Sequence, residues 1–200
     1  TSEQFKLVDV RLAFPVLGVP KPFREGQTPR FEATFLLDPT KEAHKAQVSA
    51  MKKAIKELAI AAYGEIPDAI ASGENVALHN NVRADGTQVR KYAGYEGMYY
   101  LVTAQPADVV DRKAKPQVPI IIRVPDGGID YYKGQPPVVD RNKRAVREGQ
   151  REYPYGGCYV NALISFWAQR LSAGYGPRIN CNLLAVQFAR DGETFSGRAE

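Results

Sequence analysis

Alternation of apolar and polar side chains over long segments is the feature that most constrains this fold. Residues 156–170, with the sequence GGCYVNALISFWAQR, carry apolar side chains at every second position. A period of two over such a length is typical of a β-strand with one buried face. Similar segments at 5–14, 30–37, 98–104 and 178–188 predict five principal strands in all.

For the first of these strands, the alternation predicts which side chains point into the core. Four apolar residues of the segment FKLVDVRLAF occupy every second position and are expected to point inward. They are Val8, Val10, Leu12 and Phe14. Pro15 follows directly and is expected to end the strand, because proline cannot donate a hydrogen bond to a sheet.

One long helix is expected between the second and third strands. Asp38 or Thr40 can cap its start, and it is expected to end at about Tyr63, before Gly64 and Pro67. Apolar residues at helical spacing predict one face that packs against the sheet. They are Ala43, Ala46, Met51, Ile55, Leu58 and Ala62.

Residues 106–137 read as a long insertion within the fold. A short apolar run, Val118 to Val124, precedes Gly127-Gly128 and Tyr131-Tyr132, and this order predicts a projecting β-hairpin. Residues 1–200 are therefore expected to form a single domain, mainly β with one substantial helix. The leading architecture is an OB-fold-like five-stranded, partly open antiparallel barrel with an extra β-hairpin insertion, and a double-sheet sandwich is the alternative.

Positive charge is concentrated in two short segments. The chain carries a net charge of +5. Residues 141–151 alone carry +4, because this segment contains five basic residues and one acidic residue, Glu148. A second basic segment spans residues 111–123. This distribution favours an anionic partner such as a nucleic acid, although a solvated loop has the same composition.

Motifs for catalysis, metal binding or membrane insertion are absent from the sequence. No zinc-ligand spacing, phosphate-binding loop or catalytic triad can be identified, and no apolar run reaches about 18 residues. His44 and His79 are both expected on the surface. Cys158 and Cys181 occupy apolar strand positions and are expected to be buried free thiols, with one disulfide as the alternative.

Two pairs of carboxylates could in principle hold a divalent cation. They are Asp108 with Asp111 and Asp126 with Asp130. Both pairs lie in loops rich in proline and glycine, where a solvated turn is the better interpretation. We therefore expect a protein that is not an enzyme and that needs no metal or cofactor.

Basic and aromatic side chains together favour an exposed nucleic-acid strand as the ligand, because cations neutralise phosphates and flat rings stack on bases. The candidate phosphate contacts are Arg83, Arg90, Lys91, Lys113, Lys115, Arg141, Lys143, Arg144 and Arg147. The candidate stacking residues are Tyr92, Tyr99, Tyr131, Tyr132, Tyr159 and Trp167. For Tyr159 and Trp167, burial beneath the helix or the insertion fits the sequence as well as stacking does.

Several motifs resemble a family of bacteriophage single-stranded DNA-binding proteins that was long catalogued as a domain of unknown function. The motifs are VVDRN at 138–142, GCYVNALISFWA at 157–168, NLLAVQ at 182–187 and DGETFSGR at 191–198. RLAFPVL, ATFLLDPT with its helix, and GMYYLVTA also match in order and spacing. The region 106–137 is longer than is usual in the family, and VVDRK at 109–113 is a second candidate for the family turn.

The resemblance implies an OB-fold protein that coats single-stranded DNA during phage replication or recombination, without catalysis, in the cytoplasm of the infected host. It leaves duplex binding and self-association along DNA open. Many members end in an acidic tail that recruits replication proteins, and such partners are expected here if a tail follows Glu200. The rival hypothesis is a phage structural or assembly module without affinity for nucleic acid.

Overall fold

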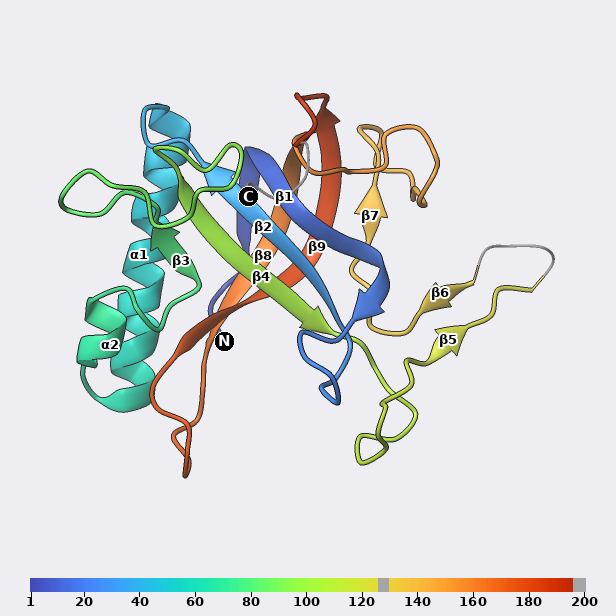
Figure 1. Cartoon of the computed structure of the whole chain (residues 1–200), viewed down its shortest axis with the longest axis horizontal. Helices are drawn as coiled ribbons and strands as arrows, with labels where there is room; N and C mark the ends of the chain where they lie inside the picture. Colours follow the sequence, from blue (N-terminus) through green and yellow to red (C-terminus); the bar gives the residue numbers. More distant parts are fainter. Residues whose placement is uncertain (126–129, 196–200) are drawn as a thin grey trace.

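Five long strands form a barrel in the computed structural model, which describes residues 1–125 and 130–195. They are β1 (Phe5–Lys21), β2 (Arg30–Leu37), β4 (Tyr99–Pro106), β8 (Tyr159–Ala168) and β9 (Ile179–Arg190). Their order is β4-β2-β1-β8-β9, with antiparallel neighbours, and one parallel pairing of Ala104 with Asn182 closes β9 onto β4 (Figure 1). The expected OB-like barrel with one substantial helix is confirmed.

The helix α1 (Glu42–Tyr63) lies along one side of the barrel (Figure 1). Gly64 ends it in the left-handed conformation, as predicted. The predicted cap is wrong, because Lys41 is the N-cap residue, and the Asp38 carboxylate instead accepts a hydrogen bond from the Thr40 backbone N–H. Three alanines of the predicted packing face, Ala43, Ala46 and Ala62, are exposed. The residues that α1 buries are His44, Val48, Met51, Ile55 and Ala59.

His44 is buried, contrary to the expectation of a surface histidine. Its Nδ1 accepts a hydrogen bond from the Asp38 backbone N–H at 3.0 Å, so Nε2 carries the proton and can donate to the Asp9 carbonyl oxygen at 3.0 Å. The side chain therefore joins α1 to β1. Burial of a histidine is acceptable here because both ring nitrogens are hydrogen-bonded.

Strand β1 differs most from its prediction. It continues through Pro15 to Lys21, and it bulges between Leu7 and Val10 and again after Ala13. Asp9 and Phe14 have φ values of 53° and 48° at these irregularities. An extra residue in a strand reverses which side chains point inward. Val8 and Phe14 are consequently 45% and 44% exposed, although both were expected in the core.

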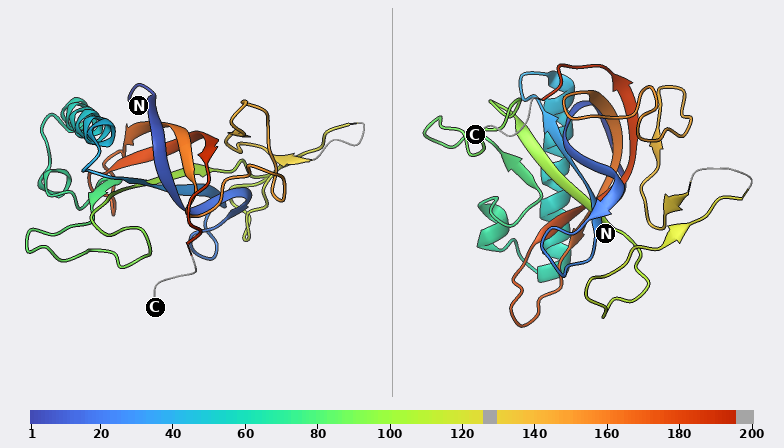
Figure 2. Two further views of the ribbon diagram at one scale, coloured as in Figure 1. Left: turned by 90° about the horizontal axis from the view of Figure 1, so that it is seen from above. Right: turned by 45° about the vertical axis from the view of Figure 1, so that its right-hand side comes forward.

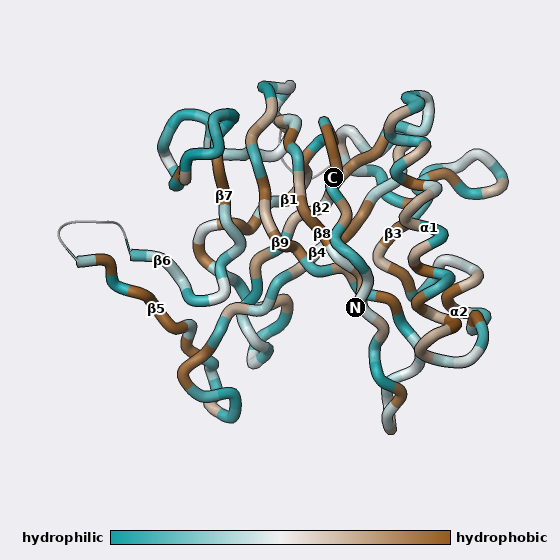
Figure 3. The backbone as a smooth tube through the Cα atoms, turned by 180° about the vertical axis from the view of Figure 1, so that it is seen from behind, coloured by the Kyte–Doolittle hydropathy of each residue, from teal (hydrophilic) through white to brown (hydrophobic). Residues whose placement is uncertain are grey.

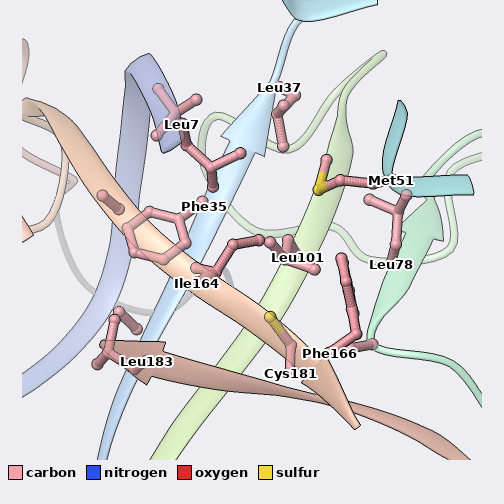
Figure 4. Packing of buried hydrophobic residues seen from close by; sticks show 14 of the residues in the cluster. Leu7, Phe35, Leu37, Met51, Leu78, Leu101, Ile164, Phe166, Cys181 and Leu183 are labelled. Atoms are coloured by element: carbon pink, nitrogen blue, oxygen red, sulfur yellow. The ribbon is translucent and has the colours of Figure 1, made fainter. Parts of the chain in front are cut away.

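The main core fills the barrel and the space beneath α1 (Figure 4). It includes the inward face predicted for β8, from Cys158 to Phe166. Cys158 and Cys181 are both buried free thiols, as predicted, and burial raises the pKa of the Cys158 thiol to about 11. Both thiols are therefore protonated at neutral pH and contribute to packing.

The remaining elements lie outside the barrel strands. They are α2 (Asp68–Ala71), β3 (Leu78–Asn80), β5 (Ile121–Ile122), β6 (Tyr131–Tyr132) and β7 (Val138–Val139). β3 and β7 extend the two ends of the sheet order, so His79 lies on an edge strand and not in a loop. β5 and β6 pair as an arm that projects from the barrel (Figures 1 and 2). Gly127 and Gly128 lie outside the described residues.

Candidate nucleic-acid interface

A second face of the sheet lies opposite the core, on the outside of β1, β2 and β4. The strand register aligns its side chains in three rows: Arg11, Leu36 and Tyr100; Ala13, Thr34 and Val102; and Val16, Glu32 and Ala104. The first row is covered by the loop after β3, whereas Val102 in the second row is 43% exposed. We call the surface formed by these rows the outer face.

Five rings follow one another along this surface. Phe14 meets Tyr92 with ring centroids 4.9 Å apart, and Tyr92 meets Tyr95 at 5.3 Å. Tyr95 contacts Tyr100 at 5.4 Å, and Tyr100 stacks on His79 at 4.8 Å. Tyr95 and Tyr100 are buried, whereas Phe14 is exposed and Tyr92 is half-buried. Phe14 and Tyr92 therefore offer flat apolar surface to a ligand, and the buried rings of Tyr95 and Tyr100 support them.

The loop that carries Tyr92 and Tyr95 is held by the fully buried Asn81. Its side-chain amide donates to the carbonyl oxygens of Arg90 and Tyr95, each at 3.0 Å, and to the side chain of Gln88. Its Oδ1 accepts from the Arg90 backbone N–H at 2.7 Å. Two amide protons shared among three acceptors, together with the amide oxygen, thus hold a loop that has no regular secondary structure.

Burial raises the pKa of Tyr95 to about 12. Its hydroxyl is hydrogen-bonded to Thr34, which opposes the shift only in part. Tyr95 is therefore neutral over the physiological range. It fixes the position of its neighbours Phe14 and Tyr92 rather than supplying charge.

At the other end of the outer face, the loop between β1 and β2 presents Phe23, which is 63% exposed. The guanidinium of Arg30 lies 4.9 Å from the centroid of this ring, and that of Arg24 lies 5.7 Å from it. Arg30 also forms an ion pair with Glu32 in the third row. An exposed ring with two guanidinium groups beside it suits one base and its phosphate.

Three of the predicted phosphate contacts lie in the same loop as Tyr92. They are Arg83, Arg90 and Lys91, and all three are exposed. The Arg83 guanidinium donates to the Gln88 carbonyl oxygen at 3.0 Å, which holds it against the loop. This loop therefore combines a predicted stacking residue with predicted cations.

Other predicted stacking residues lie elsewhere. Tyr99 points to the opposite side of β4 from Tyr100, and the Lys52 ammonium donates to its hydroxyl at 3.0 Å. Trp167 is 37% exposed near the end of β8, beside Tyr175 in the β8–β9 hairpin. Tyr131 and Tyr132 form β6 in the projecting arm.

Tyr159 is half-buried, and cations already occupy its surroundings. The Arg190 guanidinium lies 3.6 Å from the ring centroid and pairs with the Asp9 carboxylate at 2.8 Å. The hydrogen bond from Arg190 lowers the pKa of Asp9, which keeps this carboxylate ionised. One face of Tyr159 is therefore taken by an intramolecular contact.

The remaining predicted cations form two groups away from the outer face. Arg141, Lys143, Arg144 and Arg147 lie in the loop after β7, which is mostly hydrophilic (Figure 3). Arg141 pairs there with Glu152, and Arg147 donates to the Asp130 carbonyl oxygen at 3.3 Å. Lys113 and Lys115 are exposed in the loop that leads into the arm.

Apart from Tyr92, sequence reasoning missed the rings that define the outer face. Phe14 was assigned to the core, and Tyr95 and Tyr100 were not singled out. No local signal predicts the bulge that turns Phe14 outward. Phe23 did carry a readable signal, because an exposed ring between Lys21 and Arg24 in a loop has no packing role.

Within 1–125 and 130–195, no cluster of three or more histidine, cysteine or acidic side chains could hold a metal ion. Asp126, one of the four carboxylates considered above, lies outside these ranges. None of the helices in the same ranges is long and apolar enough to cross a bilayer.

Comparisons with known proteins identify close relatives of this architecture. The profile of the family described as "Enterobacter phage Enc34, ssDNA-binding protein" matches residues 3–121 and 131–200. The p50 protein of Acyrthosiphon pisum secondary endosymbiont phage 1 is 28% identical over 200 residues, which cover 97% of this chain and 87% of p50.

Two solved structures share the fold. The single-stranded DNA-binding protein from bacteriophage Enc34, in complex with ssDNA, superposes with a TM-score of 0.70 at 20% identity, over 96% of this chain and 89% of the other. The single-stranded DNA-binding protein gp2.5 of bacteriophage T7 superposes with a TM-score of 0.57 at 14% identity, over 98% and 91%. With the profile covering nearly the whole sequence, this chain belongs to the Enterobacter phage Enc34 family of single-stranded DNA-binding proteins.

Proposed function

We propose that this chain binds single-stranded DNA without sequence preference during phage DNA replication, and that the strand lies across the outer face of β1, β2 and β4. Membership of a family of single-stranded DNA-binding proteins carries the first part of the proposal. The family is one of single-stranded DNA-binding proteins, which is not an enzyme class.

The outer face supports the second part because its exposed rings stand on a rigid base. Phe14 and Tyr92 rest on the buried Tyr95, and Phe23 stands at the opposite end of the surface. Stacking of a base on an aromatic side chain contributes about 1–3 kcal/mol and tolerates any base. Rings at both ends, with Val102 exposed between them, suit a strand that crosses the face.

Cations beside these rings would neutralise the phosphates. Arg24 and Arg30 flank Phe23, and Arg90 and Lys91 flank Tyr92. Contacts of this kind give affinity that falls with salt and that does not depend on base sequence. The predicted contacts in the loop that leads into the arm and in the loop after β7 would act at longer range, by raising the local concentration of the polyanion.

Self-association along DNA and a site of action in the host cytoplasm belong to the same proposal, as does recruitment of replication proteins if an acidic tail follows Glu200. Phosphate contacts alone do not distinguish one strand from two, whereas stacking requires unpaired bases. The outer face should therefore favour single strands.

A salt series of binding isotherms tests the proposal. Fluorescence anisotropy with a labelled oligothymidylate of about 16 nucleotides, close to the upper site size of one OB-fold, should show saturable binding that weakens as salt rises. A duplex of equal length should bind more weakly at every salt concentration. Equal affinity for both, or no binding at low salt, would contradict the proposal.

A further inference from the structure

A deep cleft lies at the edge of the sheet beyond β3, outside the surface described above. It encloses about 990 Å³ between α1, α2 and β3 with its following loop. Ligand sites are typically clefts of about 300–1,000 Å³, so this one is large. The side chains that matter for its chemistry are Lys52, Lys56, His79, Arg83, Tyr99 and Tyr100.

The cleft is continuous with the outer face. Tyr100 belongs to the buried ring cluster of that face and also lines the cleft. His79 stacks on Tyr100 with an interplanar angle of 21°, and it lines the cleft from β3. The series of rings that begins at Phe14 therefore leads around the sheet edge into the cleft.

Positive charge predominates along the cleft wall. Lys52 and Lys56 come from α1 and Arg83 from the loop after β3, whereas Glu74 is the acidic side chain among the lining residues. Burial, Arg178 and Arg90 together lower the pKa of His79, so this ring is neutral and flat at physiological pH. The cleft thus pairs cations with aromatic surface, which is what a single strand requires.

Lys52 is held in place for such a role. Its Nζ donates to the Tyr99 hydroxyl at 3.0 Å and lies 4.8 Å from the centroid of the same ring. An ammonium group has three protons, so two remain for an anion such as a phosphate. Fixing the side chain in advance reduces the entropy lost when a ligand binds.

We propose that this cleft extends the binding track, so that a strand long enough to leave the outer face passes over His79 and places its next phosphates between α1 and the loop after β3. The inference rests on the proposed function, because the outer face must hold the first part of the strand. The ligand is a continuation of the same phosphodiester chain.

Charge-reversed variants of α1 and two lengths of oligothymidylate test the inference. K52E/K56E alters the cleft wall, and K45E/K53E makes the same charge change on the same helix at exposed residues that do not line the cleft. Each is measured by anisotropy with strands of about 5 and about 16 nucleotides, the range of site sizes for one OB-fold. Circular dichroism and the urea midpoint confirm that each variant folds.

We expect K52E/K56E to bind the long strand about tenfold more weakly than K45E/K53E does, as the loss of two phosphate contacts implies, and both variants to bind the short strand equally. Equal affinity of the two variants for the long strand overturns the inference. The variant F14A/Y92A distinguishes failure of this inference from failure of the proposed function. If F14A/Y92A binds the short strand as tightly as the wild type does, both the inference and the proposed function are overturned.

Discussion

The outer face and the loop after β7 both have the composition of a DNA-binding surface, and they are built in opposite ways. The outer face has few charges, but its rings are packed against one another on a sheet. The loop at 140–152 holds the densest positive charge of the chain and carries little packing. Part of that charge is already paired, as Arg141 is with Glu152.

This difference separates two contributions to binding. Ordered rings can supply affinity that persists at high salt, because stacking does not depend on counterion release. Charge in an exposed loop supplies attraction that salt removes. Density of charge in a sequence is therefore a weaker guide to the binding surface than rigid support for exposed rings.

The largest expected effect comes from removing the two outermost rings. F14A/Y92A should weaken binding of a 16-nucleotide strand by about 2–6 kcal/mol, since each stacked base is worth about 1–3 kcal/mol. Anisotropy at high salt measures this effect, because the loss should persist there. F14Y/Y92F keeps both rings and should bind like the wild type, and W167A should bind within about twofold of it. A larger loss of affinity in W167A than in F14A/Y92A would contradict the assignment of the main stacking surface to the outer face.

A smaller loss is expected when the loop of the outer face is released. N81A deletes the amide that holds Arg90 and Tyr95, and it leaves their buried backbone groups without partners. Such a loss costs about 1–3 kcal/mol. Urea unfolding should show this destabilisation, and hydrogen exchange should quicken in residues 82–97 before the barrel strands. Unchanged exchange in this loop would show that Asn81 does not order it.

Reversing charge in the loop after β7 should act only at low salt. K143E/R144E should reduce the slope of log affinity against log salt by less than about 1.4, which is the value for two direct phosphate contacts at about 0.7 each. The variant and the wild type should converge as salt rises. A deficit that persists at high salt would mean that this loop contacts the strand directly and closely.

The smallest effect concerns the support beneath the exposed rings. The pKa of Tyr95 is raised to about 12, so the folded state keeps its proton where the unfolded state, near pH 10, loses it. The resulting stability is complete below pH 10 and is lost as the pH rises towards 12. Y95F has no phenol to titrate, and its urea midpoint should fall less than that of the wild type between pH 9 and 11. Equal falls would show that Tyr95 is not buried as described.

Much of the barrel could be predicted from alternation alone. β2 has the predicted bounds, and β8 buries the predicted face, because each is a regular strand with one side in the core. The inward face and the length of β1 could not be predicted, because its register shifts depend on pairing with β2 and β8 rather than on local sequence. The position of Phe14, and with it the outer face, follows from those shifts.

The candidate site was predictable only in part, for a related reason. Tyr92 and Arg90 were candidates because basic and aromatic side chains occur together in one loop, and the structure brings Tyr92 of this loop onto the outer face. The prediction that His44 is exposed was wrong, and the direction in which Tyr99 points was left open. In both cases, contacts between distant segments decide which side of the helix or strand is covered. Composition identified the ligand class, whereas tertiary packing decides which rings are free to stack.

Photocrosslinking tests the central claim most directly. A 16-nucleotide strand with 5-iodouracil at successive positions, bound to the wild-type protein and irradiated, reports which aromatic side chains lie against bases. Mass spectrometry should locate the crosslinks at Phe14, Tyr92 and Phe23. Crosslinks confined to Trp167, Tyr131 or Tyr132 would contradict the assignment of the outer face as the DNA-binding surface.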